Sequence, residues 1–187
     1  MKRMVISLGL LVGLCMMLIG CSSVLEEEKK DPIDVLMDYS HTLIGDATAV
    51  SHISYILPAG EHVKKISLQT KTVPYELTID YGIKEDAKIT AEDFESDWNE
   101  NNTKRALLNN VIAYFILVDN LDVVHFTVEK KTPVTMTITR EQITDFVGKD
   151  VRNYSDDAEQ WKADIEEGIL KDDEKVNAFY EQHTLQS

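Results

Sequence analysis

Cysteine is nearly absent from this sequence, and its scarcity removes several kinds of chemistry. The 187 residues include only Cys15 and Cys21, both close to the N-terminus. A folded domain that begins after Cys21 therefore contains no thiol. Disulfide bonds, thiol catalysis and cysteine-ligated metals are excluded from such a domain.

Standard catalytic motifs are also missing. The chain has no G-x-S-x-G, H-E-x-x-H, S-x-x-K, P-loop or EF-hand pattern. Its five histidines are scattered along the chain. Its paired carboxylates stand at expected helix starts or in charge runs, where capping and solvation explain them. The sequence therefore favours a protein with no metal, no cofactor and no enzymatic activity.

Positive charge is scarce. The chain carries 19 Lys and Arg against 33 Asp and Glu, a formal net charge of −14 at pH 7. Lys2 and Arg3 are the only charged residues among the first 20, so the rest of the chain carries −16. This balance argues against a nucleic-acid partner and against electrostatic docking on anionic lipid. Hydrophobic residues make up 43% of the chain, enough to exclude wholesale disorder and to build one domain.

The N-terminal hydrophobic run has the form of a secretory signal peptide over residues 1–20. Lys2 and Arg3 precede an apolar stretch over 4–19, and the small Gly20 follows. About 15 apolar positions would make a helix of roughly 23 Å, shorter than the roughly 30 Å hydrocarbon core of a bilayer. We therefore expect a cleaved leader rather than a permanent membrane span.

The end of this run predicts a lipid anchor. Residues 18–21, Leu-Ile-Gly-Cys, match the bacterial lipobox, in which the peptidase cuts before a cysteine that carries lipid on sulfur. Cys21 is the predicted lipid-attachment (palmitate) site, and residues 21–30 are the lipidated cysteine and a polar tether. The expected location is the extracytoplasmic face of the cell membrane. After the leader, 14 Lys stand against 3 Arg, and this bias without disulfides indicates a Gram-positive host.

Hydrophobic periodicity predicts one α+β domain over residues 31–155, followed by a C-terminal helical tail over 156–187. Strict alternation of apolar and polar residues predicts two hairpins, with strands over 63–70 and 75–81 and over 123–128 and 134–138. Helical spacing predicts two helices before the first hairpin, one over 104–118 and one over 140–147. The order ααββαββαα implies a four-stranded antiparallel sheet with helices packed on one face.

The chain also resembles a known family over most of this domain. The resembling segments are residues 43–46, Val50, Ile53, 57–58, 67–70, 74–79, 109–110, 114–122, 124–126, 139–141, 146–150 and Arg152. Their shared order resembles domain of unknown function 4825. Its usual settings are Gram-positive lipoproteins and the outward-facing ends of membrane proteins. The resemblance implies an extracytoplasmic module and supplies no catalytic residues.

Three classes of function follow. The leading hypothesis is a membrane-anchored lipoprotein whose non-enzymatic domain acts as a binding, sensor or accessory module for an envelope protein or peptide. Trp98 lies in a polar segment without an obvious core partner, and an exposed tryptophan there would be a contact anchor. The alternative is an envelope hydrolase with an unrecognised acidic site. A third possibility is an envelope spacer with no binding cleft.

The lipid anchor is directly testable through Cys21→Ala, which removes the thiol that accepts lipid. We expect processing to stall or the protein to be shed, measured by membrane fractionation and by mass analysis of the N-terminus. A variant that is still cut after Gly20 and stays with membranes as before would overturn the lipoprotein prediction.

Overall fold

The computed structural model describes residues 30–187. The expected signal peptide, Cys21 and nearly all of the tether lie outside these residues. The elements are α1 (Pro32–Leu36), η1 (Met37–Tyr39), α2 (Ala47–Ile56), η2 (Gly60–His62), β1 (Val63–Gln69), β2 (Glu76–Tyr81), α3 (Ala91–Asp97), α4 (Glu100–Leu117), β3 (Val123–Val128), β4 (Val134–Thr139), α5 (Arg140–Val147), η3 (Val151–Tyr154), α6 (Ala158–Trp161), η4 (Lys162–Leu170) and α7 (Asp173–Gln182). Within the described residues, no helix is both long and apolar enough to cross a membrane.

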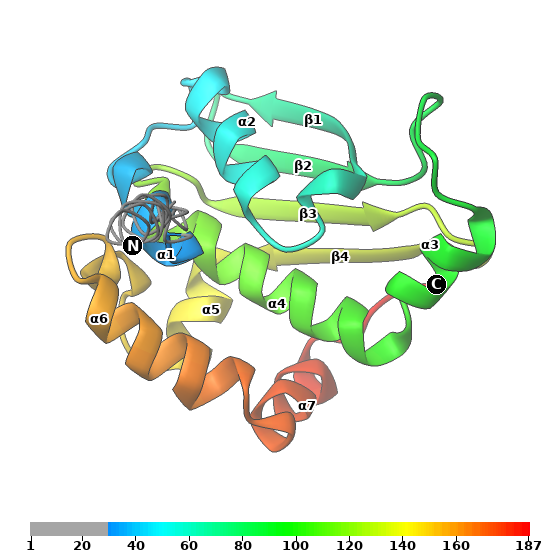
Figure 1. Cartoon of the computed structure of the whole chain (residues 1–187). Coiled ribbons are helices and arrows are strands. Elements are labelled where there is room, and N and C mark those ends of the chain that lie inside the picture. Colours follow the sequence, from blue (N-terminus) through cyan, green and yellow to red (C-terminus); the bar gives the residue numbers. More distant parts are fainter. Residues whose placement is uncertain (1–29) are drawn as a thin grey trace, which may run out of the picture.

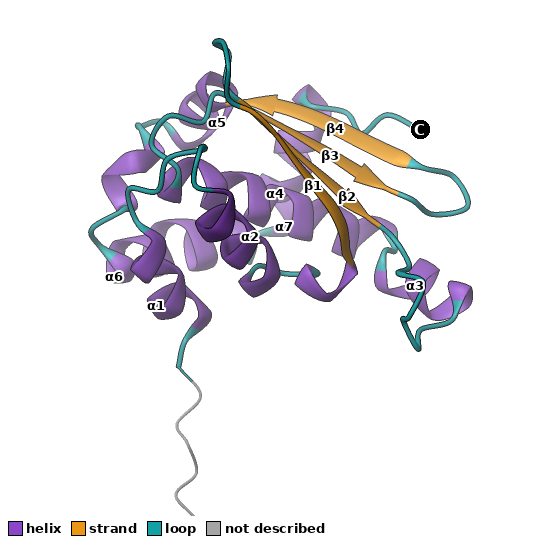
Figure 2. Cartoon of the chain, turned by 90° about the horizontal axis from the view of Figure 1, so that it is seen from above, coloured by secondary structure: helices purple, strands orange, loops and turns teal. Residues whose placement is uncertain are grey.

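The strands form one sheet in the order β1-β2-β3-β4, and the helices gather on one of its faces (Figure 1, Figure 2). Alternation decides which side chains face the helices. Leu77 and Ile79 of β2 and Val124 and Phe126 of β3 are buried, while the residues between them point to the open face. The predicted α+β class and the four strands are confirmed.

The sheet is mixed, so the prediction of a purely antiparallel sheet is wrong. Strands β1 and β2 form an antiparallel hairpin, as do β3 and β4, but β2 and β3 run parallel, with Glu76 opposite Val123. The cause is α4, whose 18 residues carry the chain back along the sheet by about 27 Å. Strand β3 therefore begins at the same end as β2, and a crossover of this kind makes the two strands parallel.

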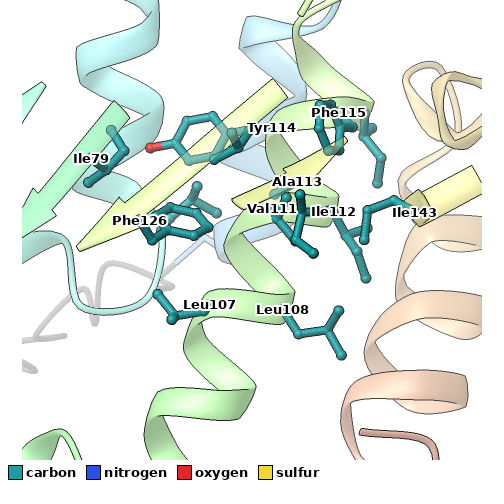
Figure 3. Close-up of a cluster of buried hydrophobic side chains, with 14 of the residues drawn as sticks. Ile79, Leu107, Leu108, Val111, Ile112, Ala113, Tyr114, Phe115, Phe126 and Ile143 are labelled. Carbon is teal, nitrogen blue, oxygen red and sulfur yellow. The ribbon is translucent and has the colours of Figure 1, made fainter. Parts of the chain in front are cut away.

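Helix α4 is the centre of the hydrophobic core. Its second half is buried almost all round, which explains why the sequence shows so little polar face there. Figure 3 shows Tyr114 beside Phe126 and Ile79 of the sheet, and Ile112 beside Ile143 of α5. The ring centroids of Tyr114 and Phe126 are 6.4 Å apart. The helix therefore joins the sheet to the outer helical layer.

Side-chain caps decide where several helices begin. Thr139 and Gln142 form the predicted capping box at the start of α5. Helix α4 begins at Glu100, earlier than the expected residue 104. The reason is Asn99, whose Oδ1 accepts the backbone N–H of Asn102 at 3.1 Å and starts the helix there.

The C-terminal segment packs into the same core. Trp161 and Tyr180 are buried, and the Tyr180 hydroxyl donates to the Lys104 carbonyl at 2.7 Å. Near the end of the chain, Gln186 and Thr135 exchange two backbone hydrogen bonds of 2.8 and 3.0 Å. This pairing covers the outer edge of β4, which would otherwise offer unpaired backbone groups.

Helix α6 continues directly into η4, a π-helix of nine residues. Trp161, Ile165 and Ile169 recur at intervals of four, and all three are buried. A wider helical turn keeps this spacing on one face, and the Lys171 N–H accordingly donates to the Glu166 carbonyl five residues back, at 3.1 Å. Long π-helical segments are rare in proteins. Single π turns, where they occur, are often found at functional sites. In the sequence, only the repeated spacing of four hints at this wider turn.

Arg140 closes the C-terminal end of α4. Its Nη1 donates to the Phe115 carbonyl at 2.5 Å, its Nη2 to that of Val118 at 2.6 Å and its Nε to that of Leu121 at 2.9 Å. These carbonyls belong to the helix end and to the turn after it, where backbone acceptors lack partners within the helix. Burial lowers the pKa of Arg140 to about 10, so the guanidinium remains charged at neutral pH.

Phe115 tests the packing of α4. Its side chain is fully buried, so Phe115→Ala should remove about 3–5 kcal/mol from the free energy of unfolding, through lost burial and a residual cavity. Thermal or urea denaturation measures the change. Tyr55→Ala is the control, because Tyr55 is an exposed aromatic residue of α2 and should change stability little. Equal melting temperatures for wild type and Phe115→Ala would contradict this packing.

Candidate functional site

A groove of about 790 Å³ lies on the helical side of the molecule. Its walls are α1, the end of α2 with the turn after it, the first half of α4, and the continuous helix α6–η4; these elements can be followed in Figure 1. The volume lies in the range of sites that take small molecules or several side chains of a peptide. We define this cavity as the α4 groove.

One face of α4 forms the floor of the groove. Asn102, Arg105, Ala106 and Asn109 line it and follow one another at intervals of three, one and three residues, which places them on one side of the helix. All four are at least partly exposed, whereas most of the helix around them is buried. The stripe is largely polar, but so are the residues around it in the first half of α4, so the sequence alone does not mark it as the floor of a groove.

Trp98 is buried, so the exposure on which its role as a contact anchor was conditional is not found. Only 1% of the residue is accessible. Its ring centroid lies 4.8 Å from that of Tyr81 and 6.2 Å from that of Phe94. Its carbonyl accepts hydrogen bonds from Thr103 and Lys130. The sequence could not reveal these partners, because Tyr81 and Lys130 reach Trp98 only in the tertiary fold.

Trp98 nevertheless forms part of the wall of the α4 groove, and so does Trp161 from the opposite helix. These two are the only tryptophans of the chain. The indole Nε1 of Trp98 is buried and has no hydrogen-bond partner among the described residues. Because both indoles border the same cavity, the intrinsic fluorescence of this protein should respond to a molecule that enters the groove.

His62 brings two carboxylates together at the rim. Its Nε2 lies 3.5 Å from Oδ2 of Asp97 and 3.8 Å from Oε1 of Glu61, and all three residues line the groove. The imidazole is buried edge-on against Phe94, with ring centroids 5.2 Å apart. A histidine between two carboxylates can hold a proton or orient a polar ligand. The arrangement is the only one in the groove with acid–base potential among the described residues.

Ion pairs and hydrogen bonds connect α1 and α4 to the α6–η4 helix on the other side of the groove. Lys162 of η4 donates to Asp34 of α1 at 2.6 Å and lies 3.7 Å from Asp31. The hydrogen bond to Asp34 raises the pKa of Lys162, so its charge is retained throughout the neutral range. Arg105 of α4 donates to the Leu170 carbonyl and to Asp173. Contacts from α1 and α4 therefore converge on the α6–η4 helix and define the width of the groove.

The open face of the sheet carries a second polar arrangement. His125 lies between Thr137, whose Oγ1 is 2.9 Å from Nδ1, and Glu76, whose Oε2 is 3.3 Å from Nε2. The order hydroxyl, imidazole and carboxylate is that of a nucleophilic triad. The three residues stand on neighbouring strands of a flat face, where the backbone amides are engaged in the sheet and do not provide an oxyanion hole. We interpret the arrangement as cross-strand pairing.

His41 joins three segments of the chain on the surface. Its two ring nitrogens each lie 3.2 Å from a carboxylate oxygen, Nδ1 from Asp119 and Nε2 from Asp156. Within residues 30–187, no group of three or more histidine or acidic side chains is placed to hold a metal ion. The carboxylates of Asp156 and Asp119 raise the pKa of His41 above its ordinary value of 6.5.

The raised pKa of His41 gives a pH prediction with a definite sign. The protonated imidazole stabilises the fold fully below its unfolded pKa, and this contribution disappears as the pH rises through the higher folded pKa. Asp156→Asn should lower the pKa of His41 towards 6.5, measured by NMR titration of the ring protons. Asp145→Asn, an exposed site on α5, is the control. An unchanged His41 titration in Asp156→Asn would show that the pair does not form.

Comparisons with known proteins identify the family of this chain but no individual protein that it resembles. No curated protein and no solved structure matches this chain. The family model described as Domain of unknown function (DUF4825) matches residues 36–140, more than half of the chain. The matched region contains the sheet, α4 and Arg140, whereas the α6–η4 wall of the groove lies after it. This chain belongs to the DUF4825 family.

Proposed function

We propose that this protein is a lipoprotein of a Gram-positive cell envelope, attached by lipid on Cys21, and that its domain binds an envelope protein or peptide in the α4 groove. It acts as a binding, sensor or accessory module and not as an enzyme. The single observation that carries the binding role is the groove itself, with the stripe of Asn102, Arg105, Ala106 and Asn109 at its floor.

The N-terminal sequence supports the location. The basic start, the short apolar run and the Leu-Ile-Gly-Cys end of residues 1–21 are what a cleaved and lipidated leader requires. Asp31 and Pro32 line the groove, only ten residues after Cys21. Ten extended residues span at most about 35 Å. In the lipidated protein, one end of the groove would therefore lie within about that distance of the membrane surface.

The composition of the groove supports binding rather than catalysis. Aromatic and aliphatic side chains such as Trp98, Trp161 and Leu57 form its deeper lining, with polar groups at the rim. Apolar walls with a few polar groups are typical of sites that bind by shape and burial.

The alternative, an envelope hydrolase, has one specific observation in its favour. Glu61, His62 and Asp97 meet at the rim, and carboxylates with a histidine are the residue types used for general acid–base catalysis. An activity screen with ester, peptide and glycoside substrates decides between the two. Turnover that Asp97→Asn abolishes, without loss of folding, would establish the hydrolase.

Site-specific photocrosslinking in the host membrane tests the binding role. A photoreactive residue at Asn102, which is exposed and lines the groove, should form light-dependent adducts with an envelope partner. The same residue at Glu141, exposed on α5 and outside the groove lining, is the matched control. Adducts in equal yield from both positions, or from neither, would contradict a binding role for the groove.

A further inference from the structure

More acidic than basic side chains line the α4 groove. Four carboxylates line it, from Asp31, Glu61, Asp97 and Glu166, against the cations of Arg105 and Lys171. Both cations are already paired with carboxylates that lie outside the lining. Arg105 binds Asp173, and Lys171 binds Glu167.

The carboxylates at the rim have fewer cationic partners that would neutralise their charge. Within residues 30–187, His62 is the only ion-pair partner of the Glu61 and Asp97 carboxylates, whose side chains are 74% and 56% exposed. Glu166 has no ion pair within the described residues, whereas Asp31 shares Lys162 with two other carboxylates. A ligand in the groove would therefore meet at least three carboxylates whose charge remains available.

The whole chain strengthens this local field. A net charge of −14 repels anionic amphiphiles such as fatty acids or phosphatidylglycerol, and it attracts cations towards a low-dielectric cleft. Besides the largely polar floor, the lining includes buried apolar side chains such as Leu57, Trp98 and Trp161. The complementary ligand has an apolar face for these side chains and positive charges for the rim carboxylates.

We propose that the α4 groove binds cationic amphipathic peptides. Apolar side chains of the peptide enter between Trp98, Ala106 and Trp161, and its lysine or arginine side chains pair with Glu61, Asp97 and Glu166. The mode is that of an amphipathic segment laid into a hydrophobic groove. The inference rests on the proposed function in taking this groove as the binding site, and it adds the chemical class of the partner.

The consequence concerns where such peptides would be captured. Electrostatic steering by an acidic surface accelerates the encounter with a cationic partner, and burial of apolar side chains slows its release. A domain tethered within a few nanometres of the bilayer would intercept such peptides at the outer membrane surface. The groove would then compete with the lipid surface for binding these peptides.

The test uses the lipidated protein in phosphatidylcholine nanodiscs and a helical Leu–Lys peptide without tryptophan. We expect a saturable change in the fluorescence of Trp98 and Trp161. Replacing the rim carboxylates together (Glu61→Gln, Asp97→Asn, Glu166→Gln) should weaken binding about ten-fold and reduce its salt dependence. Ala106→Phe, which fills the groove from α4, should weaken it at least as much.

Three controls separate the possible outcomes. Glu141→Gln with Asp145→Asn removes two exposed carboxylates of α5 and should leave affinity unchanged. A Leu–Glu peptide and oleate should both bind more weakly than the Leu–Lys peptide. Equal affinity in the triple variant, or tighter binding of oleate or the Leu–Glu peptide, overturns the inference.

The outcome also separates this inference from the proposed function. Asn102 crosslinks in the host membrane without Leu–Lys binding would reject the cationic peptide and retain the groove as a binding site. Absence of both would reject both.

Discussion

The guanidinium of Arg140 holds the end of α4 to the start of α5, and the rest of the architecture depends on this contact. Its donors satisfy the carbonyls of Phe115, Val118 and Leu121, where the helix has ended and the chain turns towards β3. The Arg140 N–H also donates to the Asp122 carbonyl at 2.9 Å. A side chain with several donors in a fixed plane suits this turn, which a lysine could not satisfy in the same way. Truncation of Arg140 would leave buried carbonyls without donors, a cost of about 1–3 kcal/mol for each.

Arg140 secures the end of α4, the helix that lies across the sheet. Helix α4 is the crossover between β2 and β3, so its direction makes those strands parallel. One side of the helix packs on the sheet through residues such as Tyr114, and the stripe that contains Ala106 faces the groove. Helix α4 therefore both connects β2 to β3 and supplies the floor of the candidate binding site.

The groove is built partly from residues inside the region that the family model matches and partly from residues outside it. Its floor and one wall lie within the region that defines the DUF4825 family, whereas Trp161, Glu166 and Leu170 come from the helix after that region. Ion pairs of Lys162 and Arg105 hold this second wall in place. In the π-helical part of that helix, Ile165 and Ile169 are buried.

Most helices and strands could be predicted from the sequence, because helix caps and hydrophobic periodicity act over a few residues. The Thr139 capping box, the alternation of β2 and β3 and the apolar run of α4 all predicted their structures, and the family was recognisable from its segments. Tertiary structure alone decided the parallel pairing of β2 with β3, the burial of Trp98 and the meeting of Glu61 with Asp97. These features rest on contacts between residues far apart in the chain, which helix caps and periodicity, acting over a few residues, do not specify.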